Sequence, residues 1–216
     1  MTSKPARRAA FLLGAFCLVL GLSGAGQPAP QHPIEFTAQQ QADLAKVSAY
    51  LNSIRTLKSN FVQLGPSGQL DQGTLYIEKP GRMRFSYEAP SPTLIVATGG
   101  NVYVRNARLN TVDRYSLSNT PLGILLDDTI DLVRNKAIMG VQEQGDSLIV
   151  QARTSANQNQ SNIALVFSFP TLELRQWMVK DNQGGVTTVA LSGTLTGVTL
   201  DDALFAIPTK TSGAAK

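Results

Sequence analysis

Hydrophobic and polar residues alternate in short runs over residues 73–105. In the first run, Leu75 and Ile77 fall on one face of an extended chain, because successive side chains of a strand point to opposite sides. Turn residues separate the runs, with Lys79-Pro80-Gly81 after the first and residues 98–101 before the last. Short strands joined by proline and glycine turns are typical of an antiparallel sheet or an open barrel, and not of a parallel α/β fold.

The same pattern continues on both sides of this stretch and predicts about ten or eleven strands in all. The additional strands are expected at residues 58–63, 108–115, 137–142, 147–152, 162–169, 173–179 and 186–191, with a further edge strand at 194–200. Three stretches, 94–97, 148–150 and 163–167, are hydrophobic on both faces, although a half-solvated sheet should alternate. Two explanations are open: a sandwich core, or a curved sheet whose hydrophobic concave side is covered by helices and leaves a cavity.

A helical period precedes the strands. Thr37 and Gln40 have the spacing of a capping box and predict a helix over residues 38–57. Its hydrophobic stripe consists of Leu44, Val47, Leu51 and Ile54. Such a stripe must be buried, and the predicted sheet is the element that it would cover.

A second helical stretch interrupts the strands near residue 120. Pro121 stands where proline is favoured, in the first turn of a helix. A leucine-rich side follows, made of Leu122, Leu125, Leu126, Ile130 and Val133. The pattern predicts a short helix, or a pair of helices, inserted between strands. A final helical turn at residues 201–205 is expected to place Leu204 and Phe205 against the rest of the domain.

The N-terminal residues have the features of a cleaved export signal. A basic segment with Lys4, Arg7 and Arg8 precedes a hydrophobic segment too short to span a membrane, and small residues follow. Cys17 lies inside the hydrophobic segment, which does not fit the lipid-bearing cysteine of a lipoprotein. The expected organisation is a signal peptide (1–26), a flexible leader (27–36), a single domain (37–208) and a disordered tail (209–216).

Removal of the signal peptide changes what the charges and reactive side chains imply. The chain has 19 Lys and Arg against 15 Asp and Glu, and three of the cations lie in the signal, which leaves a nearly neutral 16 against 15. The net positive charge of the whole chain therefore does not indicate nucleic-acid binding. The one histidine, His32, lies in the leader and the mature chain has no cysteine, which excludes His/Cys metal sites and Ser–His or Cys–His catalysis. Adjacent carboxylates at Asp127 and Asp128 would point in different directions on a helix, so neither an enzyme nor a cofactor is expected.

The motif around the central turns resembles that of the LolA family, the periplasmic carriers of outer-membrane lipoproteins. The family pattern is an F-x-Q strand, then G-x-L-x-I-x-(R/K)-P-G-x-(F/M)-R-(W/F)-x-Y, a proline, L-I-V, a glycine-rich turn and a strand with an aromatic residue. The matching residues are Phe61, Gln63, Gly73, Leu75, Ile77, Lys79, Pro80, Gly81, Met83, Arg84, Phe85, Tyr87, Pro90, Leu94, Ile95, Val96, Gly99 and Tyr103. The two helical stretches and the export signal also fit, so the resemblance covers almost the whole mature chain.

The resemblance implies an α+β, mainly β fold: a half-open antiparallel β-barrel covered by an N-terminal amphipathic helix and a helical lid. Its hydrophobic interior would hold the acyl chains of lipoprotein cargo. The carrier, a monomer in the periplasm, would receive cargo from an inner-membrane lipoprotein-releasing ABC complex and deliver it to an outer-membrane lipoprotein receptor or to the outer membrane itself. No nucleic acid, metal or cofactor is implied.

Strand parity and the resemblance together suggest which residues contact acyl chains. The inserted helix would fill the cavity and swing out when cargo enters. Lys79 would contact this lid at a position where the family usually has arginine, and lysine lacks the planar fork of that side chain. The expected cavity residues are Leu44, Val47, Leu51, Leu75, Ile77, Met83, Phe85, Ile95, Leu122, Leu125, Leu126 and Ile130. For each of them, plain core packing is the alternative.

Other functions are compatible with such a half-barrel. The outer-membrane receptor of the same pathway would need a lipid-bearing cysteine after its signal, which this sequence lacks. A periplasmic sensor, or a lipid- or glycolipid-binding protein, is the main alternative, and an enzyme would need a polar cluster in the cavity for which the sequence offers no candidate. A group of arginines could form a docking patch for an acidic partner, or simply solvated strand faces: Arg82, Arg84, Arg105 and Arg108.

Overall fold

The computed structural model describes residues 34–153 and 162–209. The predicted signal peptide, most of the predicted leader with His32, and the predicted tail from residue 210 onward lie outside the described residues, as does the polar stretch 154–161. In the part of the chain that is described, no helix is both long and hydrophobic enough to cross a membrane.

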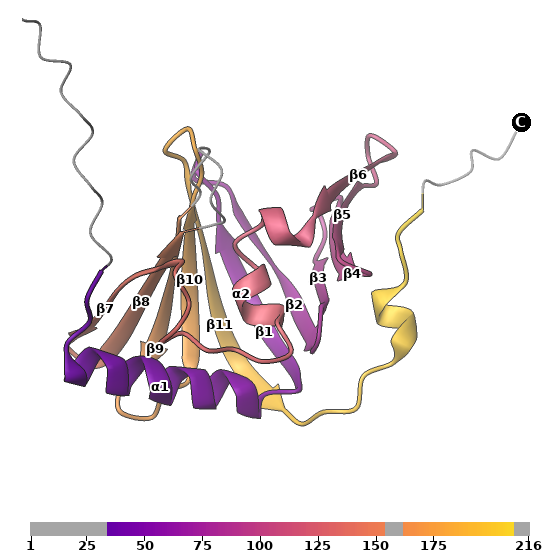
Figure 1. Ribbon diagram of the computed structural model, residues 1–216. Coiled ribbons are helices and arrows are strands. Elements are labelled where there is room, and N and C mark those ends of the chain that lie inside the picture. The colour runs from indigo at the N-terminus through magenta and orange to yellow at the C-terminus, as the bar shows by residue number, and fades with distance from the viewer. Residues whose placement is uncertain (1–33, 154–161, 210–216) are drawn as a thin grey trace, which may run out of the picture. The chain divides into compact units, whose positions relative to one another are not determined.

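The described strands form one antiparallel sheet of eleven strands (Figure 1). They are β1 (Thr56–Leu64), β2 (Leu70–Glu78), β3 (Arg82–Tyr87), β4 (Thr93–Thr98), β5 (Asn101–Asn106), β6 (Thr111–Ser116), β7 (Ile138–Gln144), β8 (Ser147–Arg153), β9 (Asn162–Ser168), β10 (Leu174–Lys180) and β11 (Val186–Thr196). Their order across the sheet is β6-β5-β4-β3-β2-β1-β11-β10-β9-β8-β7. Consecutive strands pair with each other except β6 and β7, which form the two edges, and β1 pairs with β11 in the middle of the sheet. The predicted mainly β fold is confirmed.

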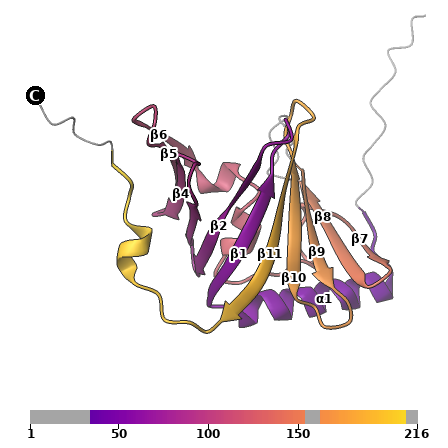
Figure 2. The same ribbon diagram turned by 180° about the vertical axis from the view of Figure 1, so that it is seen from behind.

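The sheet curves, and the helices lie on its inner side. Helix α1 (Ala38–Ser53) crosses one end of the strands, and the short helix α2 (Gly123–Leu126) lies on the concave side (Figure 1). Seen from behind, the strands stand in front of α1 (Figure 2). The curved sheet is thus the correct explanation for strands that are hydrophobic on both faces, since the described strands form one sheet and not a sandwich. Outward side chains such as Ile149 and Val166 are half-buried.

Helix α1 begins as the sequence predicts and ends earlier. The Thr37 hydroxyl accepts from Gln40 N–H, and the Gln40 side chain accepts from Thr37 N–H, which completes the capping box. The predicted end at residue 57 is wrong, because Ile54 is already extended, with φ −88° and ψ 108°. From Thr56 the backbone hydrogen-bonds into the sheet beside β2. Pairing with the sheet therefore overrides the helical period.

The inserted segment contains less helix than predicted. It consists of a 3₁₀ turn, η1 (Leu117–Asn119), and the single turn α2, after which Asp127 is extended. The expected helix through Ile130 and Val133 does not form. The physical reason is that the backbone groups of Leu126, Ile130 and Leu132 are hydrogen-bonded to other elements, so they are not available for a helical ladder.

Of the two elements predicted near the C-terminus, the strand is absent as a separate element and the helical turn forms. The predicted edge strand at 194–200 is wrong as a separate element, because β11 runs unbroken to Thr196 and pairs with both β10 and β1. The predicted terminal turn does form, as the 3₁₀ helix η2 (Asp202–Phe205) capped by Asp201. Phe205 is buried against the outer side of β3 and β4.

Candidate functional site

The inner side of the sheet gathers the hydrophobic residues that the sequence singled out. Ten of the twelve expected cavity residues are buried in one continuous core, and Ile95 and Leu122 are half-buried against it. Three elements supply them: α1, strands β2 to β4, and the insertion. The structure therefore brings all twelve together over the inner side of the sheet. Whether they contact acyl chains stays a prediction.

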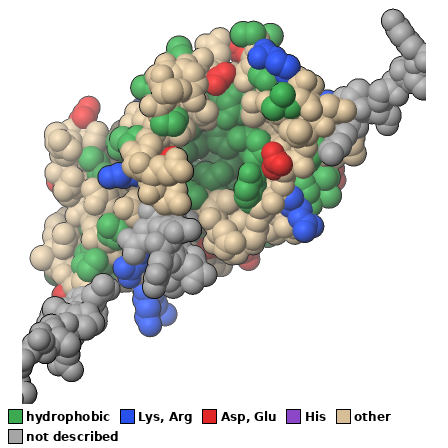
Figure 3. All heavy atoms as spheres, turned by 90° about the horizontal axis from the view of Figure 1, so that it is seen from above, with side chains coloured by type: hydrophobic (Ala, Val, Ile, Leu, Met, Phe, Trp, Pro, Cys, Tyr) green, Lys and Arg blue, Asp and Glu red, His purple; other side chains and the backbone are tan. Residues whose placement is uncertain are grey.

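A cavity of about 320 Å³ lies between the insertion and the inner side of β8 and β9. Its size is at the lower end of the ~300–1,000 Å³ of small-molecule sites. None of the twelve expected residues is among those that line it: Ser118, Thr120, Pro121, Gly123, Ile124, Asp127, Asn135, Ala137, Ala152, Arg153 and Ile163. Leu125 and Leu126 instead fill the space over the core. From the end of the sheet shown in Figure 3, the molecule is hollowed and hydrophobic side chains gather in the hollow.

An aromatic cluster forms the centre of the inner face. The Phe85 ring lies 5.1 Å from Phe61 and 6.1 Å from Trp177, both in edge-to-face geometry. Tyr87 packs edge-on against Phe61 at 5.1 Å. Edge-to-face pairs of this kind are worth about 0.5–1.5 kcal/mol beyond the area they bury. Trp177 was not singled out from the sequence as a site residue, and a bulge between Leu174 and Gln176 breaks the alternation along β10 that would have indicated its direction.

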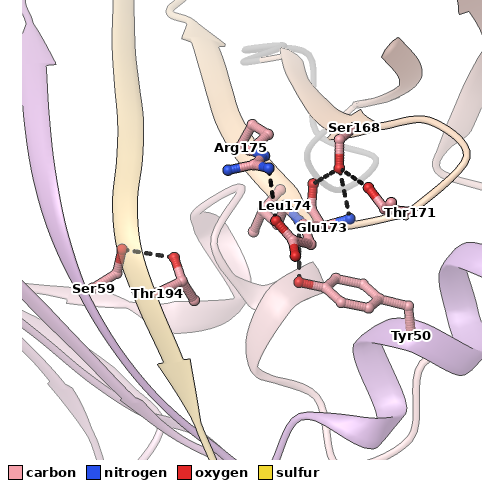
Figure 4. A network of polar contacts seen from close by, with 8 residues as sticks. All are labelled: Tyr50, Ser59, Ser168, Thr171, Glu173, Leu174, Arg175 and Thr194. Atoms are coloured by element: carbon pink, nitrogen blue, oxygen red, sulfur yellow. Dashed lines mark hydrogen bonds and ion pairs between the residues drawn. The ribbon is translucent and has the colours of Figure 1, made fainter. Parts of the chain in front are cut away.

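Helix α1 is anchored to strands β9 and β10 of the sheet through Tyr50. The Tyr50 hydroxyl accepts from Leu174 N–H at 3.1 Å, and its ring packs edge-on to Phe167 at 6.0 Å. Figure 4 shows this contact beside the Glu173–Arg175 ion pair, whose charged groups are 2.7 Å apart. Burial raises the pKa of Tyr50. The α1 side of the interior is thus closed by specific contacts.

Polar side chains on α1 hold the second part of the insertion. Asn52 makes two hydrogen bonds of 2.8 Å to the backbone N–H and C=O of Ile130. Leu132 N–H donates to the Ser48 hydroxyl at 3.0 Å. We call Ser48 and Asn52 with their two backbone partners the α1 clamp. The sequence analysis missed it, because these residues merely border the hydrophobic stripe and their partners are about 80 residues away.

An exposed ion pair continues this contact toward the sheet. Arg55 Nη1 lies 2.6 Å from Asp128 Oδ1, with both side chains more than half exposed. Such surface pairs contribute about 0–1 kcal/mol, so the ion pair adds little to the clamp. Its position nevertheless shows that residues 128–132 follow the end of α1 closely.

Lys79 lies at the junction of α1, the β2–β3 turn and the insertion. Its side chain is buried, and its Nζ donates to Leu51 O of α1 at 2.7 Å. The insertion reaches the same turn through a backbone bond, in which Gly81 N–H donates to Leu126 O at 2.9 Å. The hydrogen bond of Lys79 therefore goes to the first helix and not to the insertion.

The charges around Lys79 include those of the insertion. Burial lowers the pKa of Lys79 and the Arg55 charge adds to this effect, while Asp128 and Asp127 act in the opposite direction. Burial likewise raises the pKa of Asp127, against the influence of Lys79. The contact between Lys79 and a lid stays a prediction.

This chain is similar in sequence to a known protein family. The model of the family described as "Outer membrane lipoprotein carrier protein LolA" matches residues 52–208, which is most of the chain. This chain belongs to the LolA family.

Individual relatives are distant. A protein from Methylococcus capsulatus named "Outer-membrane lipoprotein carrier protein" is 27% identical over 170 residues, covering 74% of this chain and 81% of that protein. One of the same name from Chromobacterium violaceum is 25% identical over 174 residues, covering 77% and 84%. A solved structure of a putative outer membrane lipoprotein-sorting protein domain from Vibrio parahaemolyticus has a TM-score of 0.48 at 8% identity, covering 77% of this chain and 96% of that domain.

Three arginines of the expected docking patch bind the chain's own C-terminal segment. Arg82 pairs with Asp202 at 2.5 Å and stacks on the Phe205 ring. Arg84 donates to Leu204 O at 3.0 Å, and Arg105 donates to Thr209 O at 3.1 Å. The expected docking patch for an acidic partner is therefore not supported for these three. They hold residues 202–209 on the outer side of the sheet.

Proposed function

We propose that this protein is a periplasmic carrier that binds the acyl chains of lipoproteins on the inner side of its sheet and moves them from the inner to the outer membrane. The observation that carries this proposal is the family match over residues 52–208, together with an inner face on which every expected cavity residue is gathered. The names of the relatives support cargo of this class. In this proposal the protein binds and releases its cargo without a chemical reaction.

The cavity beside the insertion supports a lid mechanism. Because Ile124 and Thr120 form one wall of the cavity, an outward movement of residues 117–126 would join it to the hydrophobic core behind Leu125 and Leu126. Exposing each leucine to water costs about 1.5–3 kcal/mol, so the lid stays closed unless acyl chains replace the contacts it loses. The α1 clamp holds residues 130–132 and would act as the fixed end of the movement.

The energetics require direct hand-over at both membranes. Removing one acyl chain of about 15 methylenes from a bilayer costs ~12 kcal/mol at ~0.8 kcal/mol per CH₂, so free desorption is negligible. In this proposal the carrier therefore docks directly at its donor, an inner-membrane lipoprotein-releasing ABC complex, and at its acceptor, an outer-membrane receptor or the outer membrane itself. Release is feasible because the returning lid recovers part of the buried area.

The decisive measurement is native mass spectrometry of the protein purified from the periplasm of cells that overproduce a triacylated lipoprotein. We expect a one-to-one complex with the lipoprotein that survives without detergent. Protein that carries only phospholipid or glycolipid would contradict the carrier function and identify it as a lipid-binding relative of the LolA carriers.

Cross-linking tests the lid. A flexible bis-maleimide joined to Thr120→Cys and Arg153→Cys would span the cavity and tie the insertion to β8. We expect this link to abolish loading of the lipoprotein. A matched link between Arg55→Cys and Asp128→Cys joins residues already in contact at the fixed end, and should leave loading unchanged. Loading that persists with the first link would contradict the lid mechanism.

A further inference from the structure

Two residues of the LolA-like motif, far apart in sequence, meet on the inner face where its hydrophobic lining ends. The Tyr87 hydroxyl donates to Gln63 Oε1 at 2.8 Å. Gln63 is next to the last residue of β1, and Tyr87 is the last residue of β3. Both follow the inward parity of Phe61 and Phe85, against which the Tyr87 ring packs. The motif thus places one polar pair at the rim of the inner face, beside its aromatic cluster.

A carboxylate accompanies this pair. Asp71 is the register partner of Gln63 and shares the face of Leu75. Burial raises the pKa of Tyr87 to about 12, and the negative charge of Asp71 contributes to the same rise.

Acidic side chains are more frequent than basic ones at the inward positions of the described strands. By register, Asp71, Asp113 and Glu143 fall on the inner side and the paired lysines and arginines on the outer side, while Arg175 lies in a bulge and Arg153 lines the cavity beside β9. On its other side, Gln63 is the register partner of Val189 of β11, which is buried. The polar group at the rim therefore includes one negative charge, that of Asp71, next to hydrophobic residues.

The donors and acceptors left over define what this group can bind. With Oε1 of Gln63 occupied, its Nε2 has no hydrogen-bond partner among the described residues and offers N–H groups to a carbonyl oxygen. The Tyr87 oxygen and the Asp71 carboxylate offer lone pairs to an N–H donor. A matching ligand would present a carbonyl and an N–H group side by side, directly attached to acyl chains.

We propose that Gln63, Asp71 and Tyr87 form a polar subsite that binds the acylated glyceryl-cysteine at the amino terminus of cargo, through an ester or amide carbonyl and the amino-terminal N–H. This subsite rests on the proposed carrier function and adds selectivity to it. Ester and amide groups are neutral, and an unacylated amino terminus is cationic, so both suit the negative rim. Phosphate and carboxylate headgroups are repelled by Asp71, which distinguishes lipoproteins from the anionic lipids that carry the same acyl chains.

The test compares ligands that differ only at the headgroup. The exported protein is loaded with diphenylhexatriene, a fluorescent hydrocarbon without polar groups, which is then displaced by one of three dipalmitoyl compounds: a glyceryl-cysteine peptide with a free amine, its N-acetylated form, or phosphatidylglycerol. The wild type should release the probe to both peptides at lower concentration than to phosphatidylglycerol.

Variants assign the selectivity to residues. Tyr87→Phe and Gln63→Leu should each lower the affinity for both peptides about five- to tenfold, the size expected for one lost hydrogen bond. Both variants should leave the affinity for diphenylhexatriene unchanged. Asp71→Asn should reduce the difference in affinity between the peptides and phosphatidylglycerol. The control is Tyr76→Phe, which removes a hydroxyl from the outer side of β2 and should change nothing.

The outcomes separate this subsite from the carrier function. A wild-type protein that binds diphenylhexatriene and neither peptide would overturn the carrier function itself. A wild-type protein that binds the peptides, with Tyr87→Phe, Gln63→Leu and Asp71→Asn indistinguishable from it, would overturn the subsite alone.

Discussion

The two halves of the sheet bury their inner side chains to different degrees. In β8 to β10, next to α1, Trp177, Phe167 and Leu165 are almost fully buried. Toward the β6 edge, which α1 does not cover, Ile95 and Val104 are half-buried and Tyr115 is 54% exposed. The core next to α1 extends as far as Met83 and Phe85 of β3, which are also buried, whereas the β6 edge is a partly exposed surface.

The difference follows from what covers each half. Helix α1 has four turns, a complete capping box and a hydrogen bond from its Tyr50 hydroxyl to the backbone of β10. The insertion has one helical turn, and its first part is held chiefly by hydrophobic contacts of Leu122, Leu125 and Leu126. A lid must be displaced at modest cost, so it is drawn from the less stable part of a structure. Stability is concentrated in one half and the capacity to open in the other.

The largest expected effect compares aromatic residues at inward positions of the two halves. Phe167→Ala should destabilise the protein by about 3–5 kcal/mol, because it leaves a cavity in a packed core. Tyr115→Ala, on the β6 edge, should cost about 0.5 kcal/mol or less, as exposed substitutions do. Urea denaturation of both variants measures the difference. Equal losses would mean that the two halves are equally packed and that the contrast is false.

The next effect concerns the α1 clamp, which joins α1 to the second part of the insertion. Asn52→Ala leaves the backbone N–H and C=O of Ile130 without their partner, which should cost about 1–3 kcal/mol. Amide hydrogen exchange at Ile130 and Leu132 should accelerate at the same time. The control is Ser53→Ala on the exposed side of α1, whose hydroxyl bonds only within the helix. Unchanged exchange in Asn52→Ala would show that the insertion is held without the clamp.

The smallest effect is absent at neutral pH and appears only in alkali. Tyr50 on α1 and Tyr87 on β3 have raised pKa values, and that of Tyr87 is about 12. A folded pKa above the unfolded value of 10.0 contributes stability that is fully present below pH 10 and is lost as the pH rises toward 12. Absorbance titration near 295 nm should show two of the five tyrosines ionising late. Tyr87→Phe should remove one late component; if the late absorbance is unchanged, Tyr87 is not shielded from water.

Periodicity predicted the strands and the direction of their side chains well. Leu75, Ile77, Met83 and Phe85 all point inward as alternation requires, because the period of two is a local property of an extended chain. Periodicity failed at Ile54, which lies on the helical stripe but begins the connection to β1, and in the insertion, where residues 127–133 form no helix. In both places, backbone groups found partners in other elements that the local pattern does not encode.

The residues of the candidate site could likewise be predicted only in part. The hydrophobic residues of the interior could be named in advance, because burial of an apolar face is dictated by composition and spacing. The polar contacts could not: Asn52 with Ile130, Lys79 with Leu51, and Arg82 with Asp202 each join residues from 28 to 120 positions apart. A solvated polar face and a clamp are indistinguishable until the chain is folded.

The sequence by itself therefore determined that this protein is an antiparallel sheet with one hydrophobic face, a capped first helix and the motif of the LolA family. Only the tertiary structure decided that the interior is closed unevenly, that α1 holds the second part of the insertion, and that Gln63 meets Tyr87 at the rim. The physical reason is that hydrophobic burial is non-directional and follows from local pattern. A hydrogen bond needs two specific atoms within about 3 Å, which only the completed fold brings together.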